Sequence, residues 1–109
     1  MEKKDDLRES LTLISNALDI KEESVFPHDQ EFSEQELIRK LSELITYLLD
    51  KDLEKLLTAL YRIDVDENVV KRVFAEEKPE LLADSIARLI LERQKQKLEY
   101  RRKFRNPPK

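Results

Sequence analysis

The stretch that decides the fold class is SEQELIRKLSELITYLL, residues 33–49. It opens with Ser33 and Glu36, whose side chains can each accept a hydrogen bond from a backbone NH at a helix start. Phe32 and Leu37 stand at the positions of a hydrophobic staple around that cap. Apolar residues then recur every three or four positions, as one face of a helix requires; they are Leu37, Ile38, Leu41, Leu44, Ile45, Leu48 and Leu49. We therefore expect an amphipathic helix that begins at residue 33.

Upstream of this helix, the same spacing predicts another at about residues 4–20. Its apolar positions recur in steps of three and four; they are Leu7, Leu11, Ile14 and Leu18. Residues 21–32 then lose the periodicity, and Pro27 excludes a helix through them. We expect residues 21–32 to form the longest connection between helices in the chain.

Downstream, Asp50 and Asp52 interrupt the apolar face, and either one can cap a further helix. The leucine spacing also fits one continuous helix across this polar notch, so both arrangements stay open. A turn is expected at residues 62–65. Asp66 then reads as the cap of a helix that runs to about Lys78.

The last helix is expected to start at Pro79, which suits a first helical turn. Its core stripe is predicted to be Leu82, Ile86, Leu89 and Ile90, and to stop near Leu91. Helix propensity continues beyond that point, so the end of the chain should project outward or fray. Residues at the centres of the apolar stripes should form the core; they are Leu41, Leu44, Leu56, Leu60 and Phe74.

The chain has 109 residues, 41% of them charged, and contains neither glycine nor cysteine. Such a composition is typical of a helical bundle. We expect an all-α fold, a compact bundle of four to five helices with a basic C-terminal helical extension. Residues 1–98 should form a single helical domain and residues 99–109 a basic, partly disordered tail. The first residues lack a signal peptide and no stretch is apolar enough to span a membrane, so we expect a cytoplasmic protein with no membrane partner.

The charge is distributed unevenly along the chain. Residues 1–91 hold 13 Lys and Arg against 22 Asp and Glu, whereas residues 92–109 hold eight against two. The basic end also carries Tyr100 and Phe104. Aromatic rings interleaved with cations can hold single-stranded nucleic acid, although a solvated helix end explains the same residues.

Several kinds of site are disfavoured. Without glycine, the phosphate-cradling loops and the nucleophile elbow are missing. His28 is the single histidine and reads as a loop residue. The acidic segments that start at Asp50 and Asp64 begin like calcium loops, but lack the glycine and the final glutamate that such loops need. We interpret both as acidic helix N-termini, and we expect no metal and no cofactor.

The segment Val65-Asp66-Glu67-Asn68-Val69-Val70-Lys71-Arg72-Val73-Phe74 resembles the second half of a bacterial helix-turn-helix. The resemblance covers residues 56–74, with Asp66 in place of the capping serine and Asp64 in place of the turn glycine. It implies a DNA-reading helix, although that helix offers more acidic than basic side chains. The surroundings of residues 60–65 also resemble small uncharacterised bacterial all-helical proteins, a similarity that implies no activity.

The sequence therefore predicts a non-enzymatic protein-interaction or assembly module that binds a protein partner or itself, with no small-molecule substrate. The alternative is a nucleic-acid-binding accessory protein that uses the basic tail and the helix-turn-helix-like segment. A third and weaker hypothesis is an enzyme that uses Asp64 and Asp66. The candidate anion or nucleic-acid contacts are Lys71, Arg72, Lys97, Tyr100, Arg101, Arg102, Lys103, Phe104 and Arg105.

Overall fold

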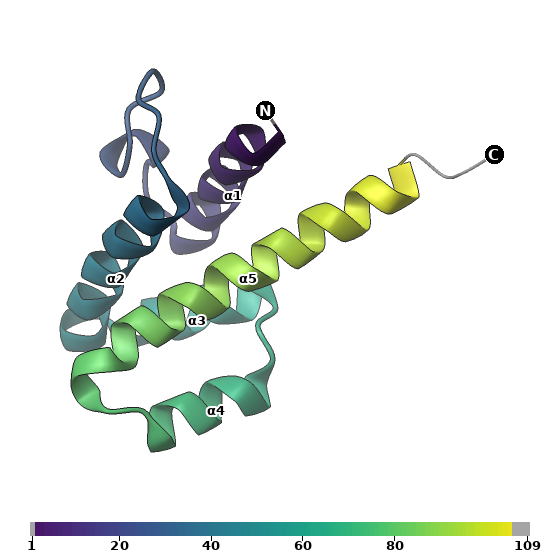
Figure 1. Ribbon diagram of the computed structural model, residues 1–109. Helices are drawn as coiled ribbons and strands as arrows, with labels where there is room; N and C mark the ends of the chain where they lie inside the picture. Colours follow the sequence, from purple (N-terminus) through teal and green to yellow (C-terminus); the bar gives the residue numbers. More distant parts are fainter. Residues whose placement is uncertain (1, 106–109) are drawn as a thin grey trace.

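The computed structural model describes residues 2–105, which form five α-helices and one 3-10 turn, without a β-strand in that range (Figure 1). This confirms the expected all-α bundle. The elements are α1 (Glu2–Leu18), the 3-10 turn η1 (Glu22–Ser24), α2 (Glu34–Lys51), α3 (Leu53–Ile63), α4 (Glu67–Glu76) and α5 (Pro79–Arg105). None of these helices combines the length and apolar character that crossing a bilayer requires.

Helix α5 runs along the middle of the bundle and packs most extensively against α2, with α1, α3 and α4 also in contact with it (Figure 1). Leu41, Leu56 and Leu60 are buried in the core, as predicted. The same prediction is wrong for Leu44 and Phe74, which are only half-buried at the edge of the core. Helix α4 contributes no fully buried residue, because α5 covers only one side of it.

The predicted capping box starts α2. The backbone NH of Ser33 donates to Glu36 Oε1 at 2.8 Å, and the NH of Glu36 donates to Ser33 Oγ at 3.1 Å. Asp52 separates α2 from α3 with an extended φ of −157°, and its Oδ1 accepts from the NH of Lys55 at 3.1 Å. The polar notch is therefore a break between two helices, and Asp52 is its cap.

Two aspartates take the left-handed conformation in which helices commonly end with glycine. Asp19 has φ 58° after α1, and Asp64 has φ 68° after α3. After each, a backbone NH reaches back to the carbonyl five residues earlier, from Ile20 to Ser15 at 3.0 Å and from Val65 to Leu60 at 3.1 Å. This is the Schellman arrangement, built here on aspartate because the chain has no glycine.

The core stripe of α5 extends further than the sequence predicts. Gln94 and Leu98 are 3% and 5% exposed, so the expected end of the stripe near Leu91 is wrong. The reason is that α1 also packs against α5. Residues 99–105 continue as helix, with the described side chains 99–103 exposed (Figure 1). The boundary at residue 98 stays a prediction, and residues 106–109 lie outside the described residues.

Candidate groove and basic surface

The outer face of α3 carries apolar side chains that the fold does not cover. Leu53, Leu57 and Tyr61 follow one another at intervals of four residues and are 44%, 44% and 85% exposed. Their neighbours Leu56 and Leu60 point into the core. Helix α3 is therefore apolar on two adjacent faces, of which the bundle uses one.

Helix α4 provides the opposite wall. It begins at Asp66, whose Oδ1 accepts from the NH of Asn68 at 2.8 Å, as the sequence predicts for a cap. Val70 and Phe74 stand one turn apart and are half-buried. The chain turns back through residues 64–66, so that α4 runs along the lower side of the bundle (Figure 1), and its side chains line one pocket together with those of α3.

Between these walls lies an apolar groove with a volume of about 750 Å³, which we call the α3–α4 groove. Leu53, Leu57 and Tyr61 line one side of it, and Val70, Phe74 and Ala75 line the other. Its two charged lining residues, Glu67 and Lys71, lie one turn apart on α4, with Lys71 Nζ 3.8 Å from Glu67 Oε2. Their side chains are 84% and 72% exposed. The charge of the groove is therefore balanced at its rim, and its interior is apolar.

The sequence pattern does not reveal this groove, because leucines at helical spacing look the same whether a neighbouring helix covers them or not. The side chain of Tyr61 is almost fully exposed, so its ring does not pack into the core. Arg62, the next residue, donates to the carbonyl of Ala17 at 3.3 Å. One feature of the sequence does indicate the groove: apolar residues extend around more than half of the circumference of α3, which is more than one buried face requires.

The structure does not gather the candidate anion contacts into one surface. Lys71 and Arg72 are exposed on α4, whereas Lys97 and residues 100–103 lie on the C-terminal half of α5, which projects away from α4 (Figure 1). The side chains of Phe104 and Arg105 lie outside the described residues.

Acidic side chains of α1 neutralise part of the basic end. Arg101 Nη1 lies 3.2 Å from Glu9 Oε2, and Arg102 forms an ion pair with Asp6. The uneven charge of the chain is thus partly balanced within the fold. Each of these pairs is solvent-exposed, and exposed pairs contribute about 0–1 kcal/mol.

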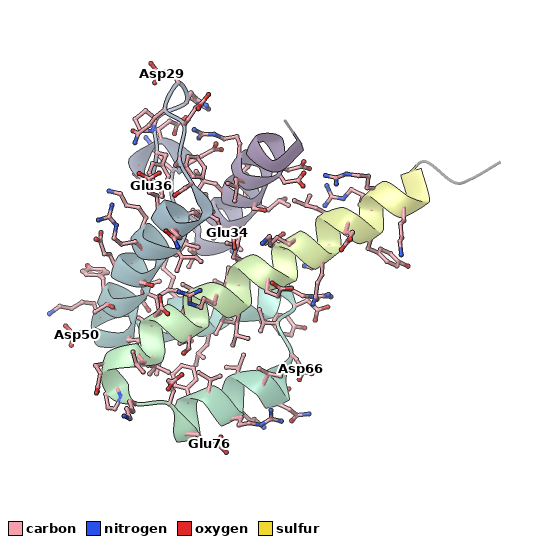
Figure 2. The ribbon with its side chains drawn as sticks, in the orientation of Figure 1. Asp29, Glu34, Glu36, Asp50, Asp66 and Glu76 are labelled. Carbon is pink, nitrogen blue, oxygen red and sulfur yellow. The ribbon has the colours of Figure 1, made fainter. Side chains whose placement is uncertain are left out.

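The two acids that the enzyme hypothesis names, Asp64 and Asp66, have structural roles, as does Asp52. Asp52 and Asp66 cap helices, and Asp64 ends α3 while its carboxylate and carbonyl both accept from Arg93. Figure 2 shows its six labelled acids spread over the surface, from Asp29 at the tip of the long connection to Glu76 on α4. Among the side chains that the structure describes, residues 6–103, no group of three His, Asp or Glu is placed to hold a metal ion.

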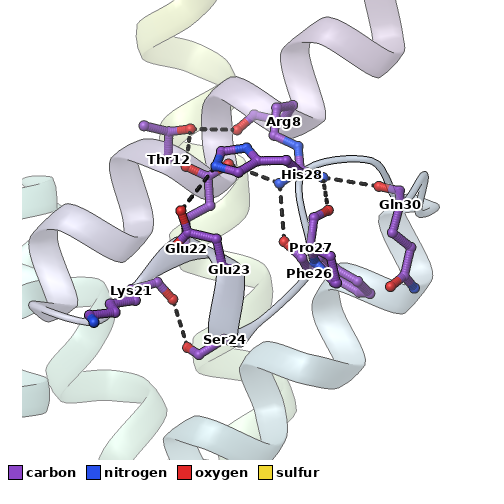
Figure 3. A network of polar contacts seen from close by, with 10 residues as sticks. All are labelled: Arg8, Thr12, Lys21, Glu22, Glu23, Ser24, Phe26, Pro27, His28 and Gln30. Atoms are coloured by element: carbon purple, nitrogen blue, oxygen red, sulfur yellow. Dashed lines mark hydrogen bonds and ion pairs between the residues drawn. The ribbon is translucent and has the colours of Figure 1, made fainter.

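A single guanidinium on α1 contacts several points of the long connection at residues 19–33. Arg8 donates to Glu22 Oε2 at 2.9 Å and to the carbonyls of Phe26, Pro27 and Gln30 at 3.3, 2.8 and 2.9 Å (Figure 3). It also lies over the ring of Phe32, 5.0 Å from the centroid. The loop is therefore held by α1 in addition to contacts within its own sequence, such as the stacked rings of Phe26 and Phe32.

Glu22 joins this network from the other side. It accepts from Arg8 and, at 2.8 Å, from Thr12 Oγ1. Burial raises the pKa of the Glu22 carboxyl, but the hydrogen bonds from Arg8 and Thr12 outweigh it, and the net pKa is lowered. His28 lies exposed in the loop, as expected, with its Nε2 3.0 Å from Glu23 Oε2.

The comparisons with known proteins add no relative to this picture. No family model matches the chain, and neither a curated protein nor a solved structure matches it significantly. The helix-turn-helix resemblance of residues 56–74 stays a prediction. The residues of the chain itself carry every functional inference that follows.

Proposed function

We propose that this protein is a non-enzymatic interaction module that binds an amphipathic helix of a partner protein in the α3–α4 groove. The observation that carries the proposal is the exposure of Leu53, Leu57 and Tyr61 on one stripe of α3. Contiguous exposed apolar patches can mark protein–protein interaction sites, whereas apolar residues exposed singly are normal. The half-buried Val70 and Phe74 across the groove extend the patch to a second helix.

The dimensions of the groove favour a short helix as its occupant. Eight residues separate Leu53 from Tyr61, which corresponds to about 12 Å along the helix axis. Two to three turns of a helix match that length, with apolar side chains every three or four residues. The lining surface is far smaller than the roughly 800 Å² that each subunit buries in a standard interface, so the groove alone does not suffice for a stable homodimer.

The balanced charge of the groove favours a protein over nucleic acid at this place. Glu67 and Lys71 offset each other, and a phosphate backbone needs a surplus of cations. The same pair is largely exposed at the rim, so it does not supply the convergent buried polar groups of a small-molecule pocket.

Site-specific photo-crosslinking tests the proposal. A photoreactive amino acid replaces Leu57 in the groove or, as the control, Tyr47, an exposed aromatic residue on α2. The proteins are expressed in their native host and irradiated, and the adducts are identified by mass spectrometry. We expect one protein to be captured at position 57 and not at position 47, and to bind the purified chain more weakly after Leu57→Glu. Equal capture at both positions, no capture, or an adduct with a second copy would each contradict the proposal.

A further inference from the structure

The C-terminal half of α5 carries three cations on one line. Arg93, Lys97 and Arg101 are four residues apart, so they project from one side of the helix over about 12 Å. We call them the basic stripe. Burial lowers the pKa of Lys97, and the charge of Arg93 and, to a smaller extent, of Arg101 lowers it further, against an opposing effect of Asp64. The three charges are therefore close enough to repel one another.

The two outer members of the stripe are paired and the central one is not. Arg93 binds the carboxylate of Asp64 at 3.1 Å, and Arg101 binds that of Glu9 at 3.2 Å. Lys97 is half-buried and forms no ion pair with a residue of the described part of the chain. An anion placed over Lys97 would thus relieve the repulsion along the stripe and would have an arginine on each side.

The residues around the stripe indicate which anion fits. Tyr100 follows Lys97 by three residues and is 65% exposed, so a planar ring lies beside the central cation. A ring for base stacking combined with cations for phosphates is the combination that binds single strands. A duplex would meet the acidic remainder of the chain, where residues 1–91 hold 22 Asp and Glu against 13 Lys and Arg.

We propose that the basic stripe binds the phosphate backbone of single-stranded nucleic acid, with Lys97 as the central contact and Tyr100 as the stacking ring. In the free protein the carboxylate of Glu9 pairs with Arg101 and acts as its internal counterion. The pair is 46% exposed on both sides, so water and salt compete for it, and a polyanion with several phosphates displaces it. The carboxylates of α1 therefore limit the affinity of the site. This site is independent of the α3–α4 groove.

Fluorescence anisotropy with a labelled oligothymidylate of about 15 nucleotides tests the stripe on the full chain. We expect binding at about 50 mM salt that Lys97→Gln weakens roughly fivefold to tenfold, with the slope of log affinity against log salt reduced by about 0.7. The matched control is Lys103→Gln, which removes the same charge from the same helix about 120° around from the stripe, and it should weaken binding much less. Circular dichroism confirms that both variants are folded.

A variant of Glu9, the carboxylate paired with Arg101, provides a separate test in which the affinity should increase. Glu9→Gln should strengthen oligothymidylate binding, whereas Glu43→Gln, which removes an exposed carboxylate from α2, should leave it nearly unchanged. The proposal is overturned by an absence of binding at low salt or by equal losses in the two lysine variants. It is also overturned if polyglutamate competes as well as unlabelled oligothymidylate, since the site would then recognise charge without the nucleic acid.

Discussion

Leu56 and Leu57 are adjacent in α3, and the structure assigns them opposite roles. Leu56 is fully buried in the core, whereas Leu57 is 44% exposed in the α3–α4 groove. Truncating a fully buried leucine to alanine removes its transfer free energy and leaves a cavity, at a cost of about 2–5 kcal/mol. Leu57→Ala loses only about half of the burial term and leaves no closed cavity, so we expect a cost below about 1 kcal/mol.

Urea denaturation followed by circular dichroism measures both values in the same way. The two variants should share one m-value, so that the difference appears in the midpoints. In thermal melts, 1 kcal/mol corresponds to roughly 4–8 °C for a domain of this size, which makes the two variants easy to separate. Equal losses of stability would refute the reasoning, because Leu57 would then belong to the core and the groove would be closed in solution.

Three further predictions concern the loop, its carboxylate and the helix ends. Arg8→Lys keeps the positive charge but loses the planar guanidinium that binds Glu22 and three loop carbonyls. It should destabilise the fold by about 1–3 kcal/mol and increase amide exchange in residues 21–33, measured by hydrogen-exchange mass spectrometry. Unchanged amide exchange in these residues would contradict the prediction. The pKa of Glu22 is lower in the folded than in the unfolded state, so its carboxylate stabilises the fold above the unfolded pKa of about 4.3, and this contribution is lost as the pH falls through the folded pKa. Glu22→Gln should therefore lower the melting temperature at pH 7 and lower it by less at acidic pH, whereas an effect that does not change with pH would contradict the assignment. Asp19→Gly should raise stability by about 0.5–1 kcal/mol, because glycine takes the left-handed φ of 58° more easily. Asp64→Gly also removes the ion pair with Arg93, so it should raise the stability by less than Asp19→Gly does. A larger increase in stability for Asp64→Gly would show that this ion pair does not stabilise the fold.

Local signals in the sequence predicted the helices well. The cap at Ser33 and Glu36, the cap at Asp66 and the proline at position 79 each act within a few residues, so the sequence contains all of their chemistry. The break at Asp52 stayed open because leucine spacing fits one helix as well as two. Only the backbone dihedral angles decide between them.

The tertiary surroundings could not be predicted in the same way. Leu53 and Leu57 have the spacing of core residues, but a neighbouring helix decides which apolar face is covered, and α4 packs against α5 instead of closing over them. Gln94 is polar in the sequence and buried in the fold because α1 packs alongside α5. The reach of Arg8 to the carbonyl of Gln30 joins residues 22 positions apart, which no local pattern encodes.

The central claim is that a partner helix binds between α3 and α4. Hydrogen exchange of the free protein and of its complex with the partner captured at position 57 tests this most directly. The account predicts increased protection in residues 53–61 and 67–75, with the amides of α2 unchanged. Protection confined to α2, or to the C-terminal half of α5, would place the partner elsewhere and contradict the account.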